Sequence, residues 1–400
     1  MKDCIYLDNN ATTRIDEEVL SAMLPYLTMY YGNPSSMHTF GGQVGKATRT
    51  ARKQVASLLG AEESEIVFTS CGTEGDNAAI RAALLAQPDR RHIITTQVEH
   101  PAVLNLCRRL EKEGYTVTYL SVDERGQLDL YEVEAALTGN TALVSVMYAN
   151  NETGTVFPVE QIAQMAKEYG ALVHVDAVQV AGKIPLNMKN SAIDFLVISG
   201  HKLHAPKGIG ALYVRRGTRF RPLLIGGHQE RGRRGGTENV PGIVALGKAA
   251  ELAEAHLANV DREGHLRDRL EKGILETIPN TVINGDPRNR LPNTTNIGFK
   301  FIEGEAILLH LDRHGICASS GSACTSGSLE PSHVLRAMGL PYSVLHGSIR
   351  FSLSRYTTEE EVDRVLEVMP EVAERLRAIS PFNSDDADWL QEQEQAVLTR

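Results

Sequence analysis

One cysteine of this sequence lies in a segment that is typical of a flexible loop. Residues 319–328 read SSGSACTSGS, so that Cys324 is surrounded by small residues, and no cysteine lies close enough in sequence to suggest a pair. A cysteine packed in a core is inert, whereas a thiol on a Gly/Ser loop can move between two places and react in each. The segment therefore predicts a reactive thiol at Cys324.

A lysine follows the apolar run of residues 193–198. Residues 199–208 read SGHKLHAPKG, which places Lys202 directly after a predicted strand. A lysine in this position can hold an aldehyde cofactor as a Schiff base. Lys207 is a competitor, but it lies in what reads as a Pro-Lys-Gly turn, and any single lysine is most often an exposed surface residue.

Two further segments offer the contacts that pyridoxal phosphate (PLP) requires. Asp176 ends an apolar, strand-like run, and a buried carboxylate there could pair with the pyridinium nitrogen, unless it only caps a helix. Gln179 could donate to the ring phenolate oxygen. The sequence CGTE from Cys71 predicts a strand-to-helix junction, where backbone N–H groups and the Thr73 hydroxyl could bind a phosphate, unless Thr73 is an ordinary helix cap. Together with the lysine, these contacts predict a PLP enzyme.

His100 and Arg350 could contact the same cofactor and its substrate. His100 precedes a proline at a predicted strand-to-helix junction, so its ring could stack on a pyridine, although a lone histidine is more often structural. Arg350 alternates with apolar residues, and its planar guanidinium could bind a substrate carboxylate or form a structural salt bridge. His201 and His204 lack the supporting ligand spacing of a metal site, so we expect no intrinsic metal.

The composition is that of an ordinary globular protein. The 400 residues are 42% hydrophobic and 23% charged, and no apolar run approaches the ~20 residues of a membrane-spanning helix. The net charge of -9 comes from interleaved acids and bases, so we expect no nucleic acid and no membrane as partners. The amino terminus lacks a signal peptide, which predicts a cytoplasmic protein. Five cysteines without Cys-x-x-Cys spacing indicate neither a disulfide framework nor a zinc site.

Predicted strands and helices alternate along the first half of the chain. This predicts an α/β fold with a mostly parallel sheet covered by helices, whose ligands bind beyond the carboxyl ends of the strands. The charged segment 261–272 is the expected connection between a large PLP-binding domain, residues 16–260, and a smaller α+β domain, residues 261–400. The smaller domain carries the loop of Cys324, and residues 1–15 should pack with it. The acidic, glutamine-rich C-terminal tail should fray.

In this order, the motifs resemble those of the cysteine desulfurases, a branch of the class V aminotransferase group of fold-type I PLP enzymes. The resemblance covers nearly the whole chain, to about Ser380. It includes three further motifs: YLDNNATT from Tyr6, GNPSS from Gly32 and ANNETG from Ala149. The NifS type of nitrogen fixation is most similar, over residues 201–224, 226–239 and 318–338, and the housekeeping IscS type is next.

The resemblance implies a role for each candidate residue. Lys202 would be the Schiff-base lysine, Cys324 the sulfur acceptor and His100 the residue that stacks on the ring. The other cofactor contacts would be Gly72, Thr73, Asn151, Asp176, Gln179, Ser199, Gly200 and His201, with Thr237 from the other subunit of a homodimer. Among these, Thr73, Ser199, His201 and Thr237 would bind the phosphate. Asn151 and Arg350 would bind the substrate carboxylate.

One residue departs from the family pattern. Gly75 stands where the family usually has serine after Thr-Glu. We expect this glycine to loosen the start of the helix by up to ~1 kcal/mol without abolishing phosphate binding.

The implied reaction removes sulfur from L-cysteine. Lys202 exchanges its Schiff base onto the substrate and takes the Cα proton, with help from His100. The Cys324 thiolate then attacks the substrate sulfur, which leaves a persulfide and L-alanine. The expected acceptor is an iron–sulfur scaffold protein of the NifU type, with Cys324 as a transient iron–sulfur ligand, which implies nitrogenase maturation. An IscS-type role, a selenocysteine lyase, a transaminase and a sulfur relay stay open.

Overall fold

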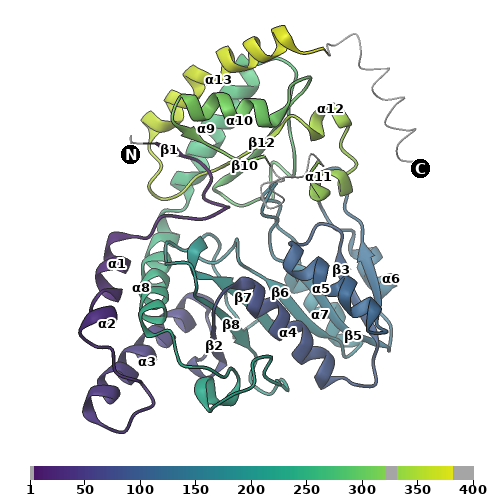
Figure 1. Cartoon of the computed structure of the whole chain (residues 1–400). Coiled ribbons are helices and arrows are strands. Elements are labelled where there is room, and N and C mark those ends of the chain that lie inside the picture. Colours follow the sequence, from purple (N-terminus) through teal and green to yellow (C-terminus); the bar gives the residue numbers. More distant parts are fainter. Residues whose placement is uncertain (1–3, 321–330, 382–400) are drawn as a thin grey trace.

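A seven-stranded sheet is the centre of the computed structural model, which describes residues 4–320 and 331–381 (Figure 1). In spatial order its strands are β2 (Ile66–Thr69), β8 (Gly210–Val214), β7 (Phe195–Ser199), β6 (Leu172–Asp176), β5 (Thr141–Met147), β3 (His92–Thr96) and β4 (Thr116–Leu120). Each pair from β7 to β4 is parallel, whereas β8 is antiparallel to both of its neighbours. The predicted α/β class with a mostly parallel sheet is confirmed.

Helices cover both faces of this sheet, which is why β5 and β7 are buried at every position. On one face, α4 (Gly72–Ala86) and α5 (Pro101–Lys112) pack against β7 and β5. The buried residues of α5 recur at helical spacing: Val103, Leu106, Cys107 and Leu110. The remaining helices of this part are α1 (Glu17–Met23), α2 (Pro25–Thr28), α3 (Thr39–Leu59), α6 (Leu130–Ala136), α7 (Val159–Glu168) and α8 (Val240–His256). Residues of α3, α6, α7 and α8 belong to the core of the other face.

A second hydrophobic core follows α8 in the chain, and Figure 1 shows its elements gathered at the top of the view. Its strands are β9 (Thr281–Ile283), β10 (Thr294–Phe299) and β12 (Ser348–Ser352), which pair antiparallel, and β11 (Ile316–Cys317), which pairs with β1 (Ile5–Tyr6). Its helices are α9 (Asp261–Thr277), α10 (Gly304–Arg313) and α13 (Glu359–Ile379). Between α10 and α13 the chain also forms α11 (His333–Ala337), which buries Val334 and Leu335 in the core of the large sheet, and α12 (Tyr342–Leu345). Leu7 of the N-terminal segment is buried in this core.

The charged segment 261–272, which we expected as a connection, forms most of α9. This helix buries Leu266, Leu270 and Ile274 in the second core. A spacing of four residues places these side chains on one face, and the many charged residues occupy most of the rest of the helix. The low overall hydrophobicity of the segment conceals this narrow apolar face.

The topology brings the predicted site segments to one edge of the large sheet. At its carboxyl end β2 leads into α4, and β3 leads into α5. β6 ends at Asp176, and β7 leads into the 3₁₀ turn η2 (Gly200–Lys202). Since these strands run in the same direction, the residues that follow them share one edge. Cys324 with its loop and the tail from Ser384 lie outside the described residues.

Candidate active site

A pocket of about 280 Å³ lies at this edge of the sheet. It brings together most of the predicted site residues: Gly72, Thr73, His100, Asn151, Asp176, Gln179, Ser199, His201, Lys202 and Arg350. Gly200 is buried within η2 and does not line the pocket. Thr237 is exposed and does not line the pocket of its own subunit either.

Lys202 ends η2 directly after β7 and reaches across the pocket to the N-terminal segment. Its Nζ donates to the main-chain oxygens of Asn10 and Ala11, the latter at 2.7 Å. Two carbonyl oxygens therefore fix the position of the amine in the pocket. The competing lysine, Lys207, is exposed and is not one of the residues that line the pocket.

Asp176 is a buried carboxylate at the end of β6, with 7% of its surface exposed. Burial raises the pKa of Asp176, whereas the Val178 N–H and the charges of His100 and Lys202 lower it. Its Oδ1 accepts from Val178 N at 2.9 Å, so the local capping contact that we left open is present. A cation in the pocket would offset the cost of burying the charged form.

The start of α4 and the end of β7 form one wall of the pocket, where an anion could bind. The Oγ of Ser199 is buried and has no hydrogen-bond partner among the described residues. At Gly72, a Cβ would lie only 2.9 Å from Val178, so the close approach of the two segments requires glycine. His201 Nδ1 lies 3.2 Å from Thr12 Oγ1. The Glu74 N–H donates to Cys71 Sγ, whereas the earlier N–H groups in the first turn of this 15-residue helix have no intrahelical acceptor and favour a phosphate at this wall.

His100 caps α5 through its ring. Its Nδ1 accepts from Ala102 N at 3.1 Å, which makes Nε2 the protonated nitrogen of the neutral ring. Burial lowers the pKa of His100, Asp176 partly opposes this, and the positive charge of Lys202 lowers the pKa further. The ring is therefore neutral near pH 7 and can accept a proton only at a cost. Part of its role is structural, as the alternative interpretation held.

Arg350 is a buried arginine of β12 with 3% of its surface exposed. Its Nη2 donates to Asp8 Oδ1 at 2.7 Å, and its Nη1 donates to the main-chain oxygen of Asn151 at 3.0 Å. The structural salt bridge that we left open is thus present. The Nε of Arg350 has no partner among the described residues. This donor stays available for a substrate carboxylate.

The comparisons with known proteins agree with this geometry. The model of the family described as aminotransferase class-V matches residues 5–365. The chain belongs to the class-V aminotransferase family. It is 76% identical to cysteine desulfurase 2 of Trichormus variabilis over 98% of this chain and 99% of that protein. It is 61% identical to the cysteine desulfurase NifS of Azotobacter vinelandii over 94% of each chain. A solved NifS-like protein matches with a TM-score of 0.87 and 40% identity, over 94% of this chain and 100% of that one.

The chain is thus a PLP-dependent cysteine desulfurase of the NifS type, and its substrate is L-cysteine. The pocket fits PLP on three independent observations. Lys202 offers an amine, Asp176 a buried carboxylate, and Ser199 a buried hydroxyl that has no hydrogen-bond partner within residues 4–320 and 331–381. In the part of the chain that the structure describes, no helix has the length and apolar character that crossing a membrane requires.

Gln179 and Asn10 are hydrogen-bonded to each other in the wall of the desulfurase pocket. Gln179 donates from Nε2 to the main-chain oxygen of Asn10 at 3.0 Å, and the side chain of Asn10 donates to Asn151 O and to Thr294 Oγ1. Asn10 was not among our predicted site residues. The sequence signal for Asn10 was its place in the N-terminal motif that begins at Tyr6. Only tertiary packing brings this segment to the carboxyl ends of the strands.

Asp76 is a second pocket residue that the sequence analysis missed. Its carboxyl is buried, with 1% exposed, and its Oδ1 lies 3.3 Å from His174 Nε2. Burial raises the pKa of Asp76 well above its usual value, and the charges of Asp176 and Glu99 raise it further. The sequence signal for Asp76 was its spacing: Asp76 follows Gly72 by four residues, so both residues lie on the same face of α4.

Gly75, the departure from the family pattern, packs against Val197 of β7. A Cβ at Gly75 would lie 2.7 Å from Val197 Cγ1, closer than real contacts allow. Helix propensity alone led us to expect that this glycine weakens the helix start, but the close approach to Val197 reverses that expectation. The variant Gly75→Ser should lose about 1–3 kcal/mol of unfolding free energy, and Val197→Ala should relieve most of that loss in the double variant. Denaturant unfolding of the four proteins measures this. Equal stability of Gly75→Ser and wild type would contradict the account.

Proposed function

We propose that this desulfurase transfers the sulfur of L-cysteine to Cys324 as a persulfide and delivers it to an iron–sulfur scaffold protein of the NifU type, for nitrogenase maturation. The observation that carries the proposal is the convergence of Lys202, Asp176 and His100 in one pocket. The 61% identity to the Azotobacter NifS protein supports the NifS type.

PLP, when bound, supplies an electron sink for the electrons of a broken Cα–H bond. In our assignment Lys202 holds the cofactor, and its Nζ takes the Cα proton of L-cysteine. Asp176 would hold a positive charge on the ring nitrogen, because that charge would offset the cost of burying the carboxylate. Gln179 would contact the ring oxygen, and the neutral His100 would stack on the ring and assist proton transfer from Nε2.

The anionic groups of cofactor and substrate meet separate parts of the pocket. In our assignment Thr73, Ser199 and His201 would bind the phosphate, beside the backbone at Gly72. Arg350 and Asn151 would hold the substrate carboxylate, for which Arg350 Nε has no competing acceptor among the described residues.

The Cys324 thiolate then attacks the substrate sulfur. A bond forms between the two sulfur atoms while the bond from the substrate sulfur to Cβ breaks, and its electron pair stays with the three-carbon skeleton. Protonation of that skeleton gives L-alanine. The step requires a reduced thiol at Cys324, which a compartment such as the cytoplasm maintains, and we place the enzyme there.

We further propose a homodimer in which Thr237 reaches the phosphate of the partner subunit. The exposure of Thr237 outside its own pocket supports this role. Large apolar side chains are exposed on α1, on α2 and on nearby loops: Leu20, Leu24, Leu27, Tyr31, Met37 and Ile225. A second subunit could cover them.

The separate core around Leu7 and α9 supports our division into residues 16–260 and 261–400, with residues 1–15 on the smaller domain.

Sulfur transfer to purified scaffolds tests the delivery step. The enzyme is loaded with radiolabelled L-[³⁵S]cysteine, freed of excess substrate and mixed with a NifU-type scaffold or with the scaffold of the housekeeping IscS type. We expect transfer to the NifU type to be at least about tenfold faster. Equal or faster transfer to the housekeeping scaffold would assign the IscS-type role instead. Preference for L-selenocysteine over L-cysteine in kcat/KM would assign a selenocysteine lyase.

A further inference from the structure

A second lysine lies behind the cofactor pocket. Lys183 donates from Nζ to Gln179 Oε1 at 3.3 Å and to Asn10 Oδ1 at 3.4 Å. Lys202 donates to the main-chain oxygen of the same Asn10. The two lysines therefore hold one asparagine from two sides, one through its side chain and one through its backbone.

The contact with Lys183 also orients the amide of Gln179. Because an ammonium group only donates hydrogen bonds, Lys183 holds Oε1 of Gln179 toward itself. The Nε2 end is then turned to Asn10 O, at 3.0 Å, and to the pocket that Gln179 lines. Nε2 is the end of the amide that can donate to the ring oxygen of the cofactor. Lys183 thus determines which end of Gln179 faces the site.

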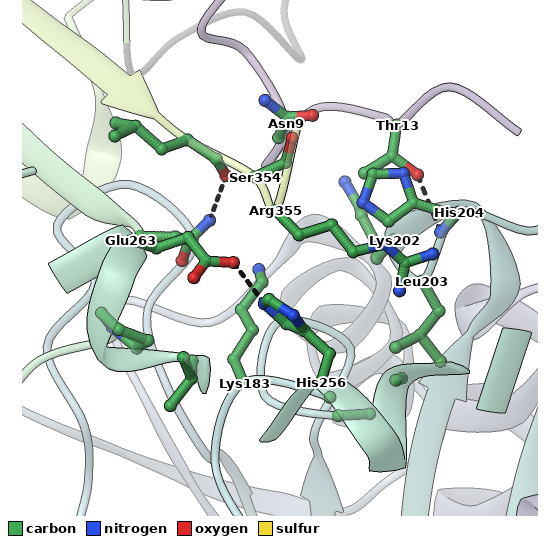
Figure 2. Close-up of a pocket in the computed structure, with 17 residues that line it drawn as sticks. Asn9, Thr13, Lys183, Lys202, Leu203, His204, His256, Glu263, Ser354 and Arg355 are labelled. Atoms are coloured by element: carbon green, nitrogen blue, oxygen red, sulfur yellow. Dashed lines mark hydrogen bonds and ion pairs between the residues drawn. The ribbon is translucent and has the colours of Figure 1, made fainter. Parts of the chain in front are cut away.

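Figure 2 shows a second cavity, of about 50 Å³, that Lys183 and Lys202 line together. Among the described residues, Lys202 alone lines both this cavity and the cofactor pocket. The charged or titratable side chains around the cavity are Lys183, Lys202, His204, His256, Glu263 and Arg355. Glu263 pairs with His256 Nε2 at 2.5 Å, and its Oε2 has no hydrogen-bond partner in the described part of the chain.

Neighbouring charges of both signs act on the pKa of Lys183. Burial lowers the pKa of Lys183 to about 7, and the positive charges of Lys202 and Arg350 contribute in the same direction. Glu263 of α9 is the negative group that opposes them. The pKa of Lys183 therefore depends on the charges of Lys202, Arg350 and Glu263. In return, the positive charge of Lys183 disfavours protonation of the Lys202 amine.

We propose that Lys183 is a positioning residue that acts on Lys202 and Gln179 from behind the cofactor pocket. It fixes the Gln179 amide and Asn10, and its positive charge disfavours protonation of the neighbouring Lys202 amine. The uncharged amine is the form that can take a proton from the substrate. This inference rests on the proposed function, in which Lys202 holds the cofactor.

The variants Lys183→Met and Lys183→Arg test the inference, with Lys189→Met as the control. Lys189 is an exposed lysine that pairs with Glu62. The visible absorbance of the PLP-loaded enzyme is titrated with pH. We expect Lys183→Met to raise the midpoint by about one pH unit, because a neighbouring positive charge is lost, and to lower kcat about tenfold with KM changed less than about threefold. Lys183→Arg and Lys189→Met should keep the wild-type midpoint.

A measurement without cofactor checks the charge of Lys183 itself. Since the pKa of Lys183 is about 7 in the folded chain and 10.5 when unfolded, the unfolded chain binds more protons between these values. The stability of the wild-type apoprotein should therefore rise with pH over this window relative to that of Lys183→Met. An absence of this rise would show that folding does not lower the pKa of Lys183, so that this amine is not coupled to the positive charge of Lys202, and would overturn the proposal.

Two results of the absorbance titration would also overturn it: an unchanged midpoint in Lys183→Met, or equal shifts in Lys183→Met and Lys183→Arg. Failure of the proposed function has a different signature. If Lys202→Ala leaves the visible absorbance of the PLP-loaded enzyme as it is in the wild type, Lys202 does not hold the cofactor. The inference on Lys183 then falls with that assignment.

Discussion

Replacement of Lys202 by alanine should lower the turnover of L-cysteine by about 10⁴-fold and remove the visible absorbance of lysine-linked PLP. Lys202 is the pocket lysine, held by the main-chain oxygens of Asn10 and Ala11, and we assign to it both the link to PLP and the removal of the Cα proton. Alanine offers neither an amine nor a base. Spectra of the PLP-loaded variant and the rate of alanine formation measure the two losses.

Lys207→Ala is the matched control for this experiment. Lys207 belongs to the same segment, but it is exposed and does not line the pocket. We expect this variant to keep the spectrum and to stay within about twofold of the wild-type rate. If Lys207→Ala instead loses the lysine-linked absorbance while Lys202→Ala keeps it, our assignment of the cofactor lysine is wrong.

Cys324→Ala should retain PLP with an unchanged spectrum and lose at least about 10²-fold in alanine formation from L-cysteine, with no persulfide detected. The variant lacks the thiolate that receives the sulfur, whereas all the cofactor contacts of the pocket remain. The rate of alanine formation and the amount of protein-bound sulfane sulfur are measured together.

Cys71→Ser is the control because Cys71 also lines the pocket and its Sγ caps α4 through the Glu74 N–H. Serine preserves this cap, since its hydroxyl accepts the same bond. We expect near-wild-type persulfide formation in this variant. Loss of persulfide in Cys71→Ser together with its retention in Cys324→Ala would move the sulfur acceptor from the loop to the pocket.

The sequence predicts those parts of the molecule that depend on local order along the chain. Strands buried on both faces and helices with one apolar face carry their own periodic signal, so the α/β class is confirmed. Asp176 and Lys202 follow directly after such strands, and a parallel sheet brings its carboxyl ends to one edge. Their presence in one pocket therefore follows from the strand order alone.

Other features depend on residues that are distant in sequence. The ion-pair partner of Arg350 is Asp8, 342 positions away in sequence. Gly75 of α4 packs against Val197 of β7, which is also distant in sequence. Lys183 looks like a surface lysine in sequence, and only the folded chain places it against Gln179. Such contacts arise from tertiary packing, which neither composition nor periodicity encodes.

Mass spectrometry of the PLP-loaded protein after brief treatment with L-cysteine tests the central claim most directly, with alanine quantified in the same sample. The account predicts a gain of one sulfur atom on the peptide that contains Cys324, in an amount that matches the alanine formed, and no such gain in Cys324→Ala. Alanine without a sulfur adduct on that peptide, or a keto acid in place of alanine, would contradict it.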